Sequence, residues 1–157
     1  MGREEFAERV LAVRNRLYRA AYLYLGSEAD ALEAVDEAVY QALRNLKKLR
    51  EPQFFETWLT RILINQCNKE LRRRRRFARV EELPETIAAE HFDHLPLKEA
   101  IQRLPEELRS VIILRYFADY TQAETADTLG IPQGTVATRQ RRALQLLRLE
   151  LGEEANT

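Results

Sequence analysis

Hydrophobic residues recur every three or four positions along most of this chain, which is the spacing of one face of an α-helix. The first predicted helix lies within residues 6–24, the second within 31–46, and the third begins near residue 55. Their hydrophobic positions are Phe6, Val10, Val13, Leu17, Ala21 and Tyr24, then Ala31, Val35, Ala38, Ala42 and Leu46, then Phe55, Trp58, Leu59, Ile62 and Leu63. No alternating strand pattern is found in the sequence. The pattern therefore predicts an all-α fold.

Residues that interrupt helices divide this pattern into two predicted domains. Residues 26–27, Gly-Ser, end the first helix and cap the second, and Pro52 breaks the chain before the third. The segment 80–96 loses the helical spacing and contains two prolines, which is typical of a linker. We expect a domain of three or four helices over residues 1–79, a flexible acidic linker over 80–96 and a second helical domain over 97–157.

The second predicted domain has the sequence features of a helix-turn-helix. Thr121 and Glu124 form a capping box at the start of a helix that runs to residue 129. Gly130 allows a tight turn, because glycine adopts positive φ at little cost. Pro132 suits the first turn of the next helix, where its missing N–H would be unbonded anyway.

The second helix of this motif would enter a DNA major groove. A helix fits that groove, and residues near its N-terminal end reach base edges and phosphates. The side chains that the helical spacing projects outward are Thr135, Thr138, Arg139 and Arg142, whereas Val136, Ala143, Leu144 and Leu147 point inward. A plain helical hairpin with a solvated arginine face is the alternative interpretation.

Charge is segregated along the chain, although its net value is zero from 25 basic and 25 acidic residues. Residues 28–37 contain acidic residues and no basic one, whereas 69–79 contain seven basic residues and one acidic residue, and 139–148 contain four arginines and no acid. A polyanion responds to the local field rather than to the net charge. The two basic segments therefore predict contact with nucleic acid, and the acidic segment predicts a basic protein surface or solvent.

Amide side chains accompany the basic end of the third predicted helix. Asn65 and Asn68 precede an unbroken run of five arginines, 72–76, and amides read base edges while arginines neutralise phosphates. Nearby aromatic residues could stack on unpaired bases. We interpret Trp58 mainly as a core residue, because an aromatic at helical spacing usually packs inside.

The remaining composition narrows the class of protein. Because Cys67 is the only cysteine, an internal disulfide and a cysteine-rich zinc site are excluded. We interpret Cys67 as a small buried residue, and a redox sensor is the alternative. No hydrophobic run is long enough for a membrane span, and the acidic N-terminal residues do not fit a secretory signal. These features predict a cytoplasmic protein.

Three sequence motifs together resemble the extracytoplasmic-function group of bacterial sigma factors. Phe55-x-x-Trp58-Leu-x-Arg61-Ile-x-x-Asn65 before the arginine run is similar to the segment that melts and reads the −10 element. The segment from Leu104-Pro-Glu-Glu-Leu-Arg109 to Gly134-Thr-Val-x-Thr-Arg139 resembles the −35 reader. The helix over 32–40 is similar to the one that docks on the clamp helices of the largest polymerase subunit.

This resemblance implies a function and a set of site residues. It implies a sigma factor that binds core RNA polymerase, reads the −35 duplex and captures melted −10 bases, with no catalytic activity, cofactor or metal of its own. The partners it implies are core RNA polymerase, promoter DNA and an anti-sigma factor. The residues it implies are Asn65 and the base-pocket loop Lys47 to Phe55, with Lys48 and Arg50, at the −10 element, Thr138, Arg141 and Arg142 at the −35 element, and Glu33, Asp36 and Glu37 for polymerase docking. The amide and basic side chains of the two predicted DNA-facing helices add Asn68, Arg72 and Arg73 at the −10 element and Thr135 and Arg139 at the −35 element.

Other functions remain open at this point. A stand-alone helix-turn-helix regulator would bind duplex DNA without polymerase, usually as a symmetric dimer. A sigma mimic that sequesters anti-sigma proteins would need a receiver domain for which no length remains. An enzyme could use His91, Asp93 and His94 around a metal, but these residues lie in the predicted linker and read as a solvated loop.

Overall fold

The computed structural model describes residues 1–80 and 95–151, and within these ranges every regular element is a helix. The first half contains α1 (Arg3–Leu25), α2 (Glu28–Arg44) and α3 (Phe55–Val80), with short 3-10 turns at Leu46–Lys48 and Pro52–Phe54 between α2 and α3. The second half contains α4 (Leu95–Arg103), α5 (Glu106–Ile112), a π-turn at Ile113–Phe117, α6 (Gln122–Leu129) and α7 (Gln133–Leu151). The predicted all-α fold is therefore confirmed.

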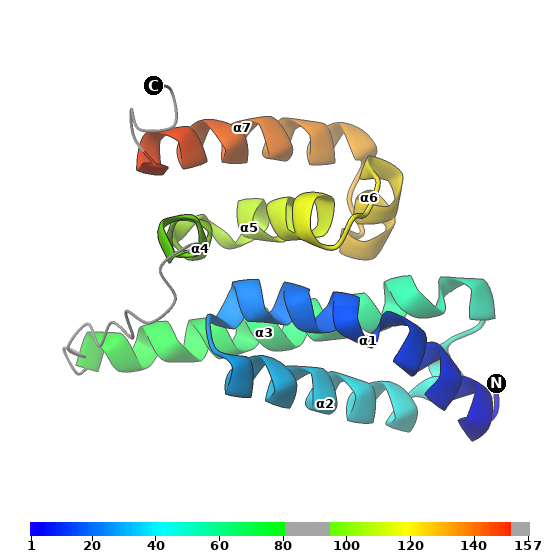
Figure 1. Cartoon of the computed structure of the whole chain (residues 1–157). Helices are drawn as coiled ribbons and strands as arrows, with labels where there is room; N and C mark the ends of the chain where they lie inside the picture. The colour runs from blue at the N-terminus through cyan, green and yellow to red at the C-terminus, as the bar shows by residue number, and fades with distance from the viewer. Residues whose placement is uncertain (81–94, 152–157) are drawn as a thin grey trace.

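The first three helices form one packed unit. Helices α1 and α2 lie side by side and α3 packs against both (Figure 1). Gly26 takes the left-handed conformation at φ 76°, and the side chain of Ser27 accepts a hydrogen bond from the Asp30 N–H at 3.3 Å. This turn reverses the chain and starts α2, as the sequence predicts.

The helix-turn-helix is formed by α6 and α7. The Thr121 hydroxyl accepts from the Glu124 N–H at 3.0 Å, and the Glu124 carboxylate accepts from the Thr121 N–H at 2.8 Å, so the predicted capping box is present. Gly130 adopts φ 69° at the end of α6. A small core then joins the motif to α5, and it consists of Val111, Ala126 and Val136 with Leu129 and Ile131 against it.

The two halves pack against each other across a shared hydrophobic core (Figure 1). Buried hydrogen bonds cross between them. The hydroxyls of Tyr24 and Ser110 are 2.6 Å apart, as are those of Thr60 and Tyr120. Buried core residues that belong to the second half include Ala100, Ile101, Leu104, Ile112, Leu114 and Leu147.

Charged side chains extend this contact to the surface. Arg61 donates from Nε to the Thr128 carbonyl at 2.7 Å, and Arg72 forms two hydrogen bonds with the Glu106 carboxylate at 3.0 and 2.7 Å. The sequence analysis predicted two domains joined by a flexible linker and left their arrangement open, and the structure packs them against each other. A helical unit of this size buries little surface alone, so hydrophobic residues such as Ile101 gain from packing on the first half.

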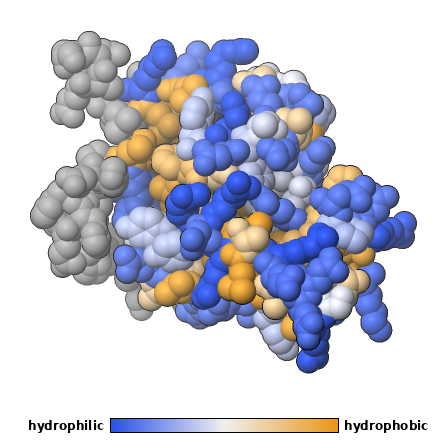
Figure 2. All heavy atoms as spheres, turned by 45° about the vertical axis from the view of Figure 1, so that its right-hand side comes forward, coloured by the Kyte–Doolittle hydropathy of each residue, from blue (hydrophilic) through white to orange (hydrophobic). Residues whose placement is uncertain are grey.

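The predicted linker falls mostly outside the described residues, as do His91, Asp93 and His94. Helix α4 begins at Leu95, so the last two residues of the predicted linker, 95 and 96, lie within the helix. In the part of the chain that the structure describes, no helix combines the length and hydrophobicity that crossing a bilayer would need. Figure 2 shows one face of the molecule on which hydrophobic residues form separate patches among hydrophilic ones.

Cys67 is a buried core residue, as the sequence predicts. Its side chain is 0% exposed, and burial raises the pKa of the thiol to about 12. Because the thiolate is the reactive form of cysteine, the structure disfavours a redox sensor at this position. Burial also raises the pKa of the hydroxyls of Tyr24 and Tyr120 above their usual value.

These buried acids predict a loss of stability in alkaline solution. Each holds its proton in the folded chain more tightly than in the unfolded chain, so the stabilisation is complete below the unfolded pKa, which for Cys67 is near 9.0. It declines as pH rises toward the folded value, by about 1 kcal/mol per pH unit for each group that titrates. Urea unfolding should therefore give a lower free energy at pH 10 than at pH 8. Cys67→Ala should make this decline shallower. An equal free energy of unfolding at pH 8 and pH 10 in the wild-type chain would contradict the raised pKa values of these buried groups.

Candidate nucleic-acid and polymerase interfaces

Helix α2 presents an acidic outer face. Its inner face is buried through Ala31, Ala34, Val35, Ala38 and Ala42, which leaves the intervening positions outside. Glu33 and Asp36 are exposed and form no ion pair with any described residue. Glu37 is half-buried and accepts a hydrogen bond from Gln41 at 3.0 Å. The three predicted docking residues therefore lie on one helix. The carboxylates of Glu33 and Asp36 are exposed to a partner, and that of Glu37 is half-buried with one hydrogen bond to its own helix.

Hydrophobic side chains share this outer face with the carboxylates. Leu32, Tyr40 and Leu43 are 45%, 54% and 37% exposed. The sequence analysis placed Leu32 and Tyr40 in the docking helix but gave none of the three side chains a role, although one signal was present: they fall between the positions that form the inward-facing row. Exposed hydrophobic residues surrounded by charges are typical of a surface that binds another protein.

A hollow of about 330 Å³ lies between the end of α2 and the first half of α3. Its lining combines one aromatic ring, four amides and two lysines, and it contains no carboxylate: Gln41, Asn45, Lys48, Trp58, Ile62, Asn65, Gln66 and Lys69. We call it the amide hollow. Residues 58, 62, 65 and 69 follow one face of α3, so the helical spacing itself aligns them. An indole can stack on a base while amides bond its edge and lysines attract its phosphate.

Of the residues predicted for the −10 element, the structure brings Asn65 and Lys48 together in the amide hollow. Trp58 lines the same hollow and is only half-buried, so its interpretation as mainly a core residue needs correction. Its ring lies in a tilted contact with the ring of Phe55, with 6.3 Å between the centroids, and it also lines the amide hollow. Gln41, Asn45 and Lys69 are further lining residues that the sequence analysis did not single out.

The other predicted −10 residues lie elsewhere. Arg50 lines a separate hollow, and Asn68 is buried at 7% exposure with no hydrogen-bond partner for its Oδ1 within the described residues. Arg72 bonds Glu106, and Arg73 bonds Glu70 at 2.9 and 2.8 Å and lies over the Phe77 ring.

Part of the arginine run holds the fold together. Arg74 donates to the Leu25 carbonyl at 2.9 Å and pairs with Asp30 at 2.5 Å, so it ties α3 to the turn between α1 and α2. Two arginines of the run, Arg75 and Arg76, are exposed and make no ion pair with the described part of the chain. Only part of the positive charge of the arginine run, residues 72–76, is therefore left unpaired by the fold and available to DNA.

The outer face of α7 carries the residues predicted for the −35 element. Thr138, Arg141 and Arg142 are exposed, whereas Thr135 and Arg139 are half-buried. None of these arginines forms an ion pair with a residue of the described ranges. The predicted residues are therefore brought together, and their charge is free to meet phosphates or guanine edges.

A hydrogen-bonded chain supports α7 from behind. Arg115 donates from Nε to Gln140 at 3.0 Å, and Gln140 donates to the Tyr116 hydroxyl at 2.9 Å. Arg115 also donates to the Tyr120 carbonyl at 2.6 Å, which anchors the π-turn. These residues were not predicted as site residues, because their pairing depends on how α7 packs against α5 and the π-turn that follows it.

Arg109, which belongs to the second sequence motif, has a structural position. It is 5% exposed and donates from Nη2 to the carbonyls of Gln102 and Leu104 at 3.1 and 2.8 Å. It therefore supplies hydrogen-bond donors to backbone carbonyls at the end of α4 that lack a partner within the helix. No group of three His, Cys, Asp or Glu side chains that could hold a metal ion occurs among the described residues.

Two family models match this chain, and together they cover most of it. Residues 10–77 match the family model described as Sigma-70 region 2, and residues 100–149 match Sigma-70, region 4. The chain is 33% identical over 143 residues to the RNA polymerase sigma factor SigV of Bacillus subtilis, covering 87% of this chain and 85% of SigV. It is 31% identical to the ECF RNA polymerase sigma factor SigM of Mycobacterium tuberculosis, covering 87% and 72%. The structure of CnrH in complex with the cytosolic domain of CnrY matches with TM-score 0.76 and 25% identity over 99% of this chain and 92% of that chain.

Proposed function

This chain belongs to the extracytoplasmic-function group of the sigma-70 family and directs transcription initiation by RNA polymerase, and we propose how its described surfaces divide that task. Residues 1–79 dock on the core enzyme and capture −10 bases. Residues 97–157 read the −35 duplex, and residues 80–96 connect the two. One observation supports this division: the chain keeps its acidic face on α2 apart from two surfaces that carry no carboxylate. These two surfaces are the amide hollow and the outer, arginine-bearing face of α7.

The acidic face of α2 binds the clamp helices of the largest polymerase subunit. Glu33, Asp36 and Glu37 supply charge, and the exposed Leu32 and Tyr40 supply hydrophobic contact. Charged surfaces of this kind guide association and orientation, while the buried hydrophobic side chains provide much of the affinity.

The amide hollow captures a base that has left the duplex. Trp58 stacks on the base, Asn65 bonds its edge, and Lys48 and Lys69 attract the neighbouring phosphates. Removing a base from the stack costs a few kcal/mol, and base-aromatic stacking offsets about 1–3 kcal/mol of it. Melting is thus a shift of population toward the single-stranded state, and it needs no chemical energy.

Helix α7 enters the major groove at the −35 element. Arg142 and Arg141 reach base edges or phosphates, and Thr138 adds a hydroxyl near the N-terminal end of the helix. The matches to sigma factors span both halves of the chain, so they favour a sigma factor over a stand-alone helix-turn-helix regulator.

An anti-sigma protein binds this chain, which is similar to CnrH, a protein solved in complex with the cytosolic domain of CnrY. The chain acts in the cytoplasm, where RNA polymerase works. It performs no reaction of its own, since the matched relatives are sigma factors, which are not enzymes.

Transcription in vitro tests this proposal. Purified chain and core RNA polymerase should start RNA synthesis at defined sites on genomic DNA, and sequencing the RNA 5′ ends should give a common −10 and −35 pattern. Asn65→Ala should weaken use of these promoters by about 1–3 kcal/mol and relax the preference at one −10 base, because a bidentate amide contact is lost. Asn15→Ala, at an exposed position on α1, serves as the control. Absence of defined start sites, or tight binding of intact duplex by the chain alone, would contradict the proposal.

A further inference from the structure

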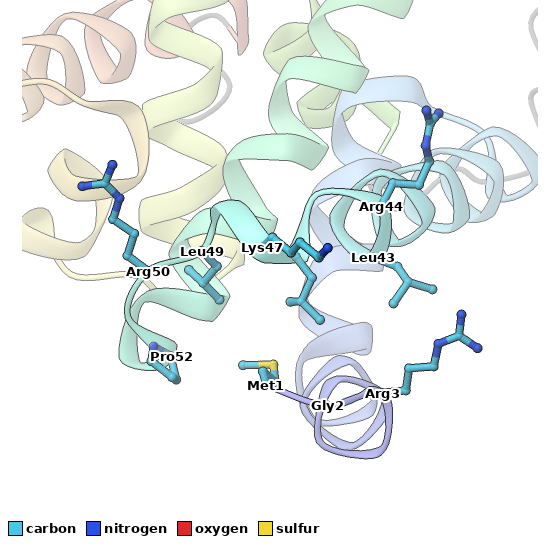
Figure 3. Close-up of a pocket in the computed structure, with 10 residues that line it drawn as sticks. Met1, Gly2, Arg3, Leu43, Arg44, Lys47, Leu49, Arg50 and Pro52 are labelled. Carbon is cyan, nitrogen blue, oxygen red and sulfur yellow. The ribbon is translucent and has the colours of Figure 1, made fainter.

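Arginine and lysine side chains supply exposed hydrogen-bond donors on several surfaces of this chain. Figure 3 shows one group of them around a hollow of about 620 Å³, which lies between the start of α1, the end of α2 and the connection to α3. Such cations attract any polyanion without fixing a direction. The phenol of Tyr116, on the π-turn before α6, is a different kind of donor, because it is neutral and other side chains hold it in place.

The direction of the hydrogen bonds around Tyr116 follows from Arg115. A guanidinium carries donors only, so the side-chain oxygen of Gln140 must face Arg115, whose Nε donates to it at 3.0 Å. The amide nitrogen of Gln140 therefore faces Tyr116 and donates to its hydroxyl oxygen at 2.9 Å. Arg115 is itself held, because it also donates to the Tyr120 carbonyl at 2.6 Å.

The proton of the Tyr116 hydroxyl is left for a partner outside the chain. The oxygen already accepts from Gln140, and no residue in the ranges 1–80 and 95–151 accepts the O–H. Tyr116 is 47% exposed, so this O–H can point outward. The Arg115 guanidinium lies 5.8 Å from the centroid of the Tyr116 ring, and successive hydrogen bonds polarise one another. An acceptor with a negative charge is the partner that suits such a donor.

Tyr116 lies beside the surface of α7 that is assigned to the −35 duplex. Gln140, which holds the hydroxyl, directly precedes Arg141 in that helix. Successive helical positions differ by about 100°, so half-buried Gln140 lies at the edge of the exposed face that carries Arg141 and Arg142. Ala137, one turn earlier, contributes only a methyl group and leaves this edge of the helix open.

The edge of a recognition helix meets phosphates. The major groove is about 12 Å wide and a helix with its side chains is about 10–12 Å across, so the two sugar-phosphate backbones run along its sides. Tyr116 therefore offers its O–H where a backbone passes. The hydroxyl of Thr138 is not equivalent, because it donates to the Gly134 carbonyl at 3.0 Å within its own helix.

From these observations we infer that the Tyr116 hydroxyl donates a hydrogen bond to one backbone phosphate beside the −35 element, and that Arg115 and Gln140 fix its direction. This inference rests on the proposed function and extends the −35 surface from α7 to the π-turn. A phosphate contact carries no base information. Tyr116 therefore sets the position of α7 in the groove, while the arginines of α7 read the sequence.

Binding of holoenzyme to promoters with one neutral phosphate tests this inference. Methylphosphonate replaces each backbone phosphate around the −35 element in turn, and affinity is measured for the wild type and for Tyr116→Phe. The variant should bind the unmodified promoter about tenfold more weakly, which corresponds to the loss of one hydrogen bond to a charged group. At one modified phosphate the two proteins should bind equally, because the acceptor is already lost there. At the other positions the tenfold difference should persist.

Two further readouts separate a phosphate contact from a structural role. Phenylalanine removes no charge, so the slope of log affinity against log salt should keep its wild-type value. The preference among promoters with single −35 changes should also stay the same. Tyr18→Phe is the matched control, because Tyr18 is half-buried on α1 and its hydroxyl makes no hydrogen bond within the described ranges. This control should bind within about twofold of the wild type.

Three results would overturn the inference. A tenfold difference at every modified phosphate, or a changed −35 preference, would show that Tyr116→Phe only displaces α7. Affinity of Tyr116→Phe within about twofold of the wild type on the unmodified promoter would show that the hydroxyl makes no contact that matters for binding.

The direction of the hydrogen bonds has a test of its own. A carboxylate accepts from both neighbours, so Gln140→Glu should turn the Tyr116 O–H inward. Adding Tyr116→Phe to Gln140→Glu should then change affinity by less than about twofold, and this comparison keeps the added charge constant. A full tenfold loss in that background would overturn the inference, because the hydroxyl would then act without direction from Gln140.

The transcription assay separates this inference from the proposed function. Defined start sites with the wild-type chain, combined with no phosphate at which Tyr116→Phe and the wild type bind equally, would overturn this inference alone. Failure of the wild-type chain to start transcription would overturn the proposed function and, with it, the role of Tyr116 at the −35 element.

Discussion

Replacing Glu33 and Asp36 together by lysine should weaken binding to core RNA polymerase by about 100-fold. Both side chains are exposed on the outer face of α2 and have no ion-pair partner in the described ranges, so the fold should tolerate the change. Placing like charges opposite each other across an interface costs several kcal/mol, and about 3 kcal/mol corresponds to the stated loss. Titration of labelled chain with core polymerase measures the effect.

The control for this experiment is Glu107→Lys, which makes a similar charge reversal at an exposed position at the start of α5. Its affinity for core polymerase should stay within about twofold of wild type, because distant surface charges are screened by salt. Thermal unfolding followed by circular dichroism should give similar midpoints for all three proteins. If the double variant binds core polymerase as tightly as the control does, then the docking face lies elsewhere.

Removing the Arg142 side chain should weaken −35 binding by about 1–3 kcal/mol if the guanidinium reads a base. Arg142→Ala then loses its preference at one −35 position, so promoters that differ only there become equal in strength. A phosphate contact would instead lower affinity for all promoters alike and reduce the salt slope by about 1. Binding of holoenzyme to a set of promoters with single −35 changes distinguishes these results.

Arg148→Ala is the matched control, because Arg148 is exposed on the same helix in its last turns. A helix placed in the major groove reads bases mainly with its N-terminal residues, so this control should bind promoters nearly as wild type does. Equal losses in Arg142→Ala and Arg148→Ala would show that general charge, and no specific contact, drives −35 binding.

Local sequence signals predicted the helices and caps well because their causes lie within a few residues. Thr121 and Glu124 bond each other across three residues, and Gly130 is the one position in that turn with positive φ. Hydrogen bonds of this kind form within one turn of backbone, so spacing alone reveals them. The exposed arginines of α7 followed in the same way from helical periodicity.

The candidate sites were only partly predictable. Asn65 and Lys48 were identified from different segments, but their meeting in one hollow with Trp58 depends on how α2 packs against α3. Trp58 was predicted to be mainly core because periodicity reports which side of a helix is hydrophobic and does not report how much of that side a neighbour covers. The uniform run of arginines likewise gave no sign that one of them, Arg74, has a structural role and pairs with Asp30 inside the first half.

The sequence by itself determined the helical elements, the helix-turn-helix and the separation of acidic from basic segments, since each arises from residues within one or two helical turns of one another. The tertiary structure alone decided that the halves share a core through contacts such as Tyr24 with Ser110, and that two hollows flank the connection after α2. Those features join residues far apart in the chain. Their existence depends on packing free energy summed over many side chains, which no local pattern records.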